Sequence, residues 1–241
     1  MKRLSEYLTV NESELSSIKP ANKDELKRLI DQRIKEQGPN CDLNDIDVSK
    51  IDDMSRLFCD SKFNGDISKW DVSNVKDMRY MFDCSMFNGD ISEWDVSNVR
   101  DMSYMFMQSQ FKGDLSKWDV SNVIVMSNMF NNSKFTGDIS KWDVSNVKDM
   151  SNMFWGTDFS RDISKWEVSS VRSMKFMFGC SGFNSDISKW DVSNVKNMDS
   201  MFYKSKFRGD LSKWDVSSVK SMYNMFENSP LDGKEPSWYK D

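Results

Sequence analysis

A unit of 24 residues recurs along this chain without insertion or deletion, and no other feature limits the possible folds so strongly. Phenylalanine stands at position 1 of the unit and tryptophan at position 8. The phenylalanines are Phe63, Phe87, Phe111, Phe135, Phe159, Phe183 and Phe207, and the tryptophans are Trp70, Trp94, Trp118, Trp142, Trp166, Trp190, Trp214 and Trp238. A divergent copy occupies 39–62, and a truncated one begins at Leu231. Units of this length cannot bury a core alone, so we expect them to stack on one another.

Within one unit, the spacing of apolar residues predicts a short strand followed by a short helical turn. Trp70 and Val72 alternate with polar neighbours, which is the two-residue period of a strand. Asn74 is a candidate helix N-cap, and the apolar residues after it have the spacing of one helix face. These residues are Val75, Met78, Met81 and Phe82. We therefore expect an α/β repeat solenoid of about eight stacked coils, each with a short strand and a short α-helical or 3₁₀ turn.

The composition agrees with a thin core that is repeated many times. Apolar residues make up 38% of the chain, below the usual share of about 45–50%. The apolar residues are bulky, however, since 13% of the chain is aromatic and 18 residues are methionine. Because the tryptophans, phenylalanines and methionines recur at fixed unit positions, we interpret them as core rather than as a metal or sugar site.

A helical cap is expected before the first coil, because a terminal coil exposes a cross-section of the core. Residues 22–37 have the features of a helix, with Asn22 as N-cap, Glu25 in a capping box and Gly38 at the C-terminal end. Its apolar face consists of Leu26, Leu29, Ile30 and Ile34. We expect an N-terminal helical cap at 1–38, a solenoid at 39–230 and a C-terminal partial repeat or cap at 231–241. A shorter helix is expected in the first 21 residues.

Several classes of function are disfavoured by what the sequence lacks. Histidine is absent, and no nucleophile has a neighbouring base, so we expect neither an enzyme nor a cofactor site. A net charge of −5 without a long basic stretch makes nucleic-acid binding an unfavoured prediction. No stretch approaches the roughly 18–20 apolar residues that span a bilayer. Acidic residues interrupt the N-terminal segment, which does not resemble a signal peptide. These features predict a cytoplasmic protein, with the cell surface after non-classical export as the alternative.

The repeat core D-I-S-x-W-D-V-S-x-V-x-x-M-x-x-M-F, seen for example at 66–82, resembles the BspA-type leucine-rich-repeat (LRR) surface proteins of bacteria. The resemblance extends over the eight copies at 39–230. It implies a right-handed, LRR-like solenoid. Proteins of that family are associated with surface attachment and protein binding, so the resemblance also implies a binding role.

Columns of aspartate and four cysteines are the remaining candidate sites. The columns that begin at Asp66 and Asp71 should stack coil on coil, where they could bind calcium, mimic a nucleic-acid backbone, or cap turns beside stripes of lysine. We favour turn capping, and expect no metal site. Cys59 and Cys84 could meet on adjacent coils, whereas Cys84 and Cys180 are four coils apart and too distant to form a disulfide. Free thiols are therefore the expectation.

The variable positions carry the functional prediction. Positions 14, 17, 18 and 21 of the unit should lie on the outward face of the helical segment, and several copies are apolar or aromatic there. The candidate partner-binding residues are Tyr80, Tyr104, Met107, Ile124, Val125, Trp155, Phe176, Tyr203 and Tyr223. We expect Met107, Ile124 and Trp155 to form one patch, with Trp155 as the anchor.

Exposed aromatic residues are typical of the centre of a protein interface, so the sequence predicts a scaffold that binds a partner protein. Self-association through the same face and neutral variation of exposed positions remain open as explanations of these residues. A structural or adhesive surface rod and an acidic nucleic-acid-mimicking inhibitor are the alternative functions.

Overall fold

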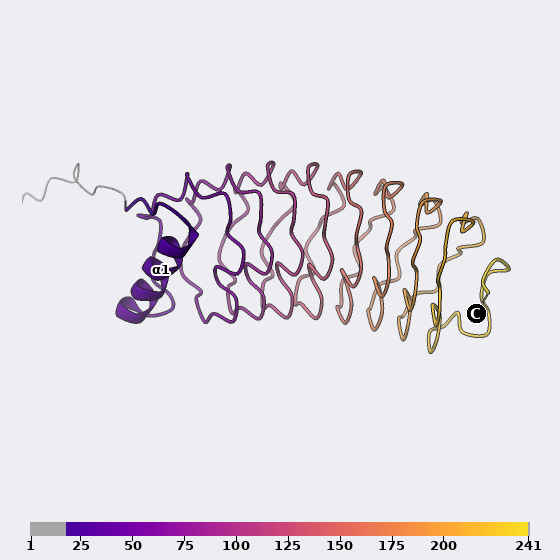
Figure 1. Ribbon diagram of the computed structural model, residues 1–241. Coiled ribbons are helices and arrows are strands. Elements are labelled where there is room, and N and C mark those ends of the chain that lie inside the picture. The colour runs from indigo at the N-terminus through magenta and orange to yellow at the C-terminus, as the bar shows by residue number, and fades with distance from the viewer. Residues whose placement is uncertain (1–17, 241) are drawn as a thin grey trace, which may run out of the picture.

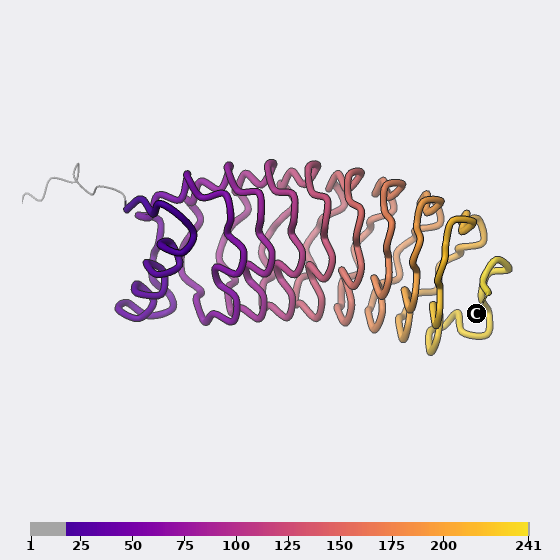
Figure 2. Tube along the Cα trace, viewed as in Figure 1, coloured from indigo at the N-terminus to yellow at the C-terminus, as the bar shows by residue number. Residues whose placement is uncertain are grey.

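The computed structural model describes residues 18–240, in which the repeats lie side by side along one axis and form a rod (Figures 1 and 2). The chain is therefore a repeat protein, as the sequence predicted. Each repeat makes one coil of the rod, and the coils are numbered here in chain order. Coils 1 to 8 are 39–62, 63–86, 87–110, 111–134, 135–158, 159–182, 183–206 and 207–230. Unit positions are counted from Phe63 as position 1 of coil 2.

The predicted helix before the first coil is confirmed as α1, Lys23–Gln37. The side chain of Asn22 accepts a hydrogen bond from the Glu25 N–H, and Gly38 ends the helix with a φ of 88°. Leu26 and Ile30 are fully buried in the same core as the coils. α1 lies at the N-terminal end of the rod (Figure 1), where it covers the core that coil 1 would otherwise expose. The shorter helix expected in the first 21 residues falls largely on 1–17, which lie outside the described residues.

The strand and the helical turn predicted for each coil are wrong. In coil 2, residues 70–72 have no regular structure, and residues 75–82 are irregular and turn backbone with a single β-bridge residue, Asp77. Within residues 18–240, α1 is the only helix, and the coils are joined by isolated parallel β-bridges at position 15, such as Asp77 to Asp101. The fold is therefore a rod of stacked turns.

Two consecutive turns, linked by a bond of 3.2 Å from the Asp83 N–H to the Tyr80 carbonyl, occupy the segment that was expected to be helical. The Met81 N–H donates to the Met78 carbonyl at 3.2 Å, and the Ser85 N–H donates to the Phe82 carbonyl at 3.2 Å. The third residue of each turn, Tyr80 or Cys84, has a positive φ of 57° or 52°. An i to i+3 bond with positive φ at the third residue is the geometry of a type II turn. Positions 18 and 22 have positive φ in every coil, although most of these residues are not glycine.

Stacking explains why turns replace the helix. The N–H groups at positions 16, 18, 20 and 22 donate to carbonyls of the next coil, so that Met78 bonds Asp101 at 3.0 Å and Phe82 bonds Met105 at 2.9 Å. A helix would use these donors within its own coil, and neighbouring coils would lose them. The N–H groups of the segment therefore alternate between bonds to the next coil and bonds within their own coil.

The inward side chains form continuous columns. The rings of Trp70 and Trp94 lie 6.4 Å apart with an interplanar angle of 5°, and Phe82 and Phe106 lie 5.5 Å apart. Each indole N–H of the tryptophan column donates to the carbonyl of position 5 in the preceding coil, as Trp94 does to Ile67 at 3.2 Å. The tryptophans are therefore hydrogen-bonded core residues, as predicted for these positions.

Candidate binding surface on the outward side of the turns

The outward side of the turns consists of positions 17, 18, 21 and 22, since positions 16, 19 and 20 point into the core. Seven of the nine predicted site residues lie on this side. Tyr80, Tyr104 and Phe176 occupy position 18; Met107, Trp155 and Tyr203 occupy position 21; Tyr223 occupies position 17. Ile124 and Val125, at positions 14 and 15, precede the turns. The helical spacing that placed eight of the nine on one face does not apply, because no helix forms there.

Four of these residues gather on coils 5 to 8, and we call Trp155, Phe176, Tyr203 and Tyr223 the aromatic patch. The rings of Trp155 and Phe176 meet edge to face at 5.2 Å, and those of Trp155 and Tyr203 are parallel at 6.2 Å. Tyr223 is 66% exposed and lies in the same hollow as Phe176 and Tyr203. The patch therefore continues over four successive coils.

Trp155 reaches Tyr203, two coils away, because the coil between them carries glycine at the same position. A Cβ atom on Gly179 would lie 2.2 Å from Cζ3 of Trp155, so the indole lies directly on the backbone there. The backbone of Gly179 does not have positive φ, and its small size is what this site uses. Gly179 is a functional candidate that the sequence prediction missed.

A hollow of about 330 Å³ opens within the aromatic patch, over coils 6 to 8. The side chains around it include Phe176, Tyr203 and Tyr223, together with the carboxylates of Asp199 and Glu227. Ser200, which is only 6% exposed, also lines it. None of the last three was predicted, because polar residues at outward positions give no signal in the sequence.

A second aromatic group lies on coils 2 and 3 and is closed by a cation. The rings of Tyr80 and Tyr104 stack at 4.3 Å, and the guanidinium of Arg56 lies 4.0 Å from the centre of the Tyr80 ring. All three residues occupy position 18 in successive coils. The ring faces of Tyr80 are thus used within the protein.

Ile124 and Val125 have a different setting from the aromatic patch. Ile124 is 39% exposed, and Val125 forms β-bridges with Asp101 and Asp149 in the neighbouring coils. Val125 therefore interrupts a column of aspartates and separates the carboxylate of Asp101 from that of Asp149. The ring contacts of Trp155 go to later coils, so the structure groups it with Phe176 and Tyr203.

Comparison with protein families identifies the family to which these repeats belong. A family model described as "Mycoplasma protein of unknown function, DUF285" matches residues 26–137 and again residues 125–238. The chain belongs to the DUF285 family. No curated protein and no solved structure matches the chain. The BspA-type resemblance stays a prediction.

The aspartate columns of these DUF285 coils cap turns. Asp66 and its equivalents accept a hydrogen bond from the backbone N–H two residues later, at 2.9 Å from Ser68 to Asp66. Asp71 does the same for Ser73 at 3.1 Å. The bond from the Ser68 backbone lowers the pKa of Asp66 below its ordinary value. The prediction that these aspartates cap turns is confirmed.

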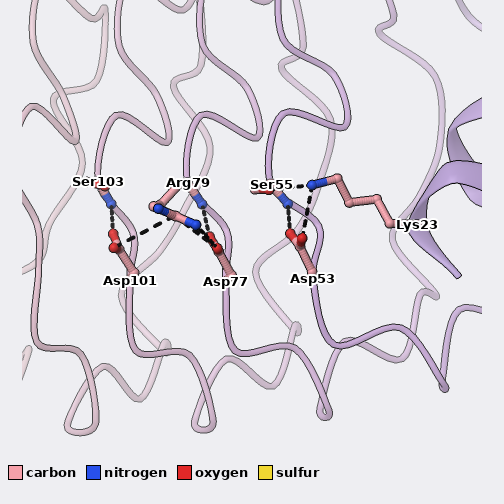
Figure 3. Close-up of polar contacts among 7 residues, drawn as sticks. All are labelled: Lys23, Asp53, Ser55, Asp77, Arg79, Asp101 and Ser103. Carbon is pink, nitrogen blue, oxygen red and sulfur yellow. Dashed lines mark hydrogen bonds and ion pairs between the residues drawn. The ribbon is translucent and has the colours of Figure 1, made fainter.

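A third column, at position 15, is neutralised by cations near the N-terminal end. Figure 3 shows Lys23 of α1 beside Asp53 and Arg79 between Asp77 and Asp101. The Arg79 guanidinium donates to Asp77 at 2.5 Å and lies 3.8 Å from Asp101. Lys23 lies 3.0 Å from Asp53, which also ties α1 to coil 1. Within the described residues, no three Cys, Asp or Glu side chains converge on a metal position.

The cysteines are free, and two of them flank a buried carboxyl group. Burial and the nearby Asp83 raise the pKa of Cys59 and of Cys84 to about 11. Oδ1 of Asp83 is buried and has no hydrogen-bond partner among the described residues. Burial raises the pKa of Asp83 itself.

In the part of the chain that the structure describes, no helix combines the length and apolar character needed to cross a bilayer.

Proposed function

We propose that this DUF285 protein is a non-catalytic scaffold that binds a partner protein through the aromatic patch. The observation that carries the proposal is the concentration of Trp155, Phe176, Tyr203 and Tyr223 at variable positions of four successive coils. Tyrosine, tryptophan and phenylalanine are enriched at the centres of protein interfaces, where they contribute most of the binding energy.

The stacking of coils does not require aromatic residues at these positions. Coil 4 has the same turns with Ser127, Asn128 and Asn131 at positions 17, 18 and 21. Its backbone bonds match those of coil 6, as the Asn128 N–H to Ser151 bond of 2.8 Å and the Phe176 N–H to Asp199 bond of 2.9 Å illustrate. Aromatic side chains in coils 5 to 8 are therefore additions to the architecture, which supports a role in recognition.

The proposal includes an LRR-like solenoid of the BspA type and a cytoplasmic location. Four free cysteines support a reducing compartment. Fractionation of the native host would test the location, since recovery of the protein at the cell surface would favour the adhesive rod instead.

The main experiment compares two double variants that use residues natural to the repeat. Phe176→Asn with Tyr203→Asn removes half of the patch, and coil 4 shows that asparagine is accepted at both positions. Tyr80→Asn with Tyr104→Asn is the matched control in the closed aromatic group. We expect capture from native-host extracts to recover a protein with the wild type and the control but not with the patch variant.

Direct binding of the recovered protein, measured by calorimetry, should repeat this order. Equal binding by the patch variant and the control would contradict the proposal. Sedimentation at increasing concentration separates self-association, because a patch that joins copies of this chain would give oligomers that the patch variant lacks.

A further inference from the structure

The hollow in the aromatic patch exists because position 18 of coil 7 carries a small residue. Ser200 stands between Phe176 of coil 6 and Asn224 of coil 8 in the same column. Its N–H donates to the Tyr223 carbonyl at 2.8 Å, so its backbone is part of the regular ladder. Only its side chain departs from the bulky residues that Tyr80, Tyr104 and Phe176 place at this position.

The walls of the hollow combine aromatic rings with carboxylates. Phe176, Tyr203 and Tyr223 supply the rings, and Asp199 and Glu227 supply the negative charge. Oδ1 of Asp199 accepts hydrogen bonds from the Ser221 hydroxyl and, at 3.0 Å, from the Tyr223 N–H, whereas its Oδ2 accepts none from the described residues. Ring faces attract cations, and carboxylates bind them through charge-assisted hydrogen bonds.

Lysines of the protein already approach two of these rings. The Lys175 ammonium lies 5.2 Å from the centre of the Phe176 ring, and the Lys204 ammonium lies 5.0 Å from that of Tyr203. Within the described residues, no such cation lies over the Tyr223 ring. Two carboxylates and one ammonium, that of Lys175, line the hollow, so a cationic guest gains from stacking on the rings as well as from charge, which favours a planar cation over a compact one.

The closed aromatic group on coils 1 to 3 contains an internal version of this contact. There, the Arg56 guanidinium from position 18 of coil 1 lies 4.0 Å from the ring centre of Tyr80 at position 18 of coil 2. Position 18 of coil 7 is the place beside Phe176 where a comparable side chain is missing. The rod itself thus shows that a guanidinium can lie over a ring in this column.

We infer that the hollow over Ser200 receives an arginine side chain of the partner protein. This inference rests on the proposed function and names the chemistry of the partner. An acidic guest would face Asp199 and Glu227, and an apolar guest would bury the Oδ2 atom of Asp199 without a hydrogen bond. A guanidinium stacks on the rings and donates to a carboxylate at the same time.

The first test uses short peptides. Acetyl-Gly-Arg-Gly-amide, its citrulline version and its lysine version are titrated into the full chain, and NMR follows the Ser200 and Tyr223 amides. Citrulline has the shape of arginine without its charge. We expect saturable shifts with arginine and binding weaker by about tenfold or more with citrulline, as for loss of a cation–π contact and a charge-assisted bond.

The second test closes the hollow with a residue that the repeat already uses. Ser200→Tyr should abolish arginine binding without unfolding the chain, since Tyr80 has a φ of 57° at this position and Ser200 has 53°. Asn128→Tyr places the same side chain in the same column three coils away, and it should leave binding unchanged. Glu227→Gln should weaken arginine binding without abolishing it, because the charge of one carboxylate is lost and stacking on the rings remains.

The outcomes separate this inference from the proposed function. If partner capture depends on Phe176 and Tyr203 while arginine peptides give no saturable shift up to their solubility limit, the arginine assignment is overturned and the scaffold stands. Equal binding of arginine and citrulline, or shifts caused only by a neutral sugar such as maltotriose, would overturn it as well. Peptide binding that survives Ser200→Tyr would place the contact outside the hollow.

Discussion

The two aromatic groups of the rod have the same backbone turns but form different surfaces, one covered and one hollow. On coils 2 and 3, Tyr80 and Tyr104 stack on each other and Arg56 covers the outer ring face. On coils 5 to 8, Trp155 bends across Gly179 toward Tyr203, and the small Ser200 leaves a hollow. The first group is satisfied within the protein, and the second keeps a concave surface lined by rings.

The difference shows that outward side chains can change without changing the turns. Positive φ at positions 18 and 22 is accepted by tyrosine, phenylalanine, cysteine, serine and lysine alike, because bonds to neighbouring coils fix the backbone. Such a conformation costs an ordinary residue on the order of 1 kcal/mol or more. The stack of coils compensates this cost in every repeat, so a surface can be assembled residue by residue.

The largest expected effect tests whether the cores beneath the two regions contribute equally to stability. Phe82→Ala beneath the closed group and Phe178→Ala beneath the patch should each destabilise the chain by about 3–5 kcal/mol, since both side chains are fully buried. Urea unfolding followed by circular dichroism measures this. Tyr80→Asn, on the surface, serves as the control. A clear inequality between the two phenylalanines would mean that the regions differ in their cores as well as in their surfaces.

A smaller effect is expected where the patch depends on a missing side chain. Gly179→Ala places a Cβ 2.2 Å from the Trp155 ring, so the indole must move, at a cost of about 1–3 kcal/mol. Trp155 emission, obtained by difference from a Trp155→Phe reference, should shift to the red. In Gly182→Ala the nearest atom is 3.5 Å away, and neither change should appear. An unchanged spectrum for Gly179→Ala would show that Trp155 does not rest on this glycine.

At position 21 the closed region has a buried carboxyl group where the patch has aromatic rings. Asp83→Asn should stabilise the protein at neutral pH by about 1 kcal/mol, because burial raises the Asp83 pKa and its Oδ1 has no partner. A raised pKa in the folded state means that stability falls as pH rises from 3.8 through the folded pKa. Unfolding at several pH values should show this slope in the wild type and its loss in the variant.

The smallest effect on stability opens the closed group. Arg56→Ser removes an exposed side chain and should change the free energy of unfolding by less than about 0.5 kcal/mol. It should also uncover the Tyr80 ring, so that arginine peptides shift the Tyr80 amide as they shift that of Tyr223. Lack of any new binding would show that rings alone are insufficient and that Asp199 and Glu227 are required.

Much of this architecture could be predicted from the sequence, because a strict repeat makes equivalent residues stack. The core columns, the turn-capping aspartates and α1 all follow from period and residue type. The helical turn did not, since the spacing of Met78, Met81 and Phe82 suits a helix face and two consecutive turns equally well. Only the need of neighbouring coils for N–H donors decides between them.

The candidate site divides in the same way. Phe176, Tyr203 and Tyr223 could be found, because large apolar residues stand out at variable positions. Ser200 and Gly179 could not, since their contribution is the space they leave empty, and space depends on neighbours one and two coils away. The grouping of Trp155 likewise follows from stacking geometry rather than from helical spacing.

The unbroken 24-residue spacing also makes the coils interchangeable. Each coil donates N–H groups to the next coil and accepts the same set of bonds from the coil before it. The backbone of coil 3 could therefore bond to coil 5 as it bonds to coil 4. Removal or duplication of a whole unit would then shorten or lengthen the rod and leave the backbone bonds among the other coils intact. Exchange of units offers such a chain a way to rearrange its recognition surface without having to evolve a new fold.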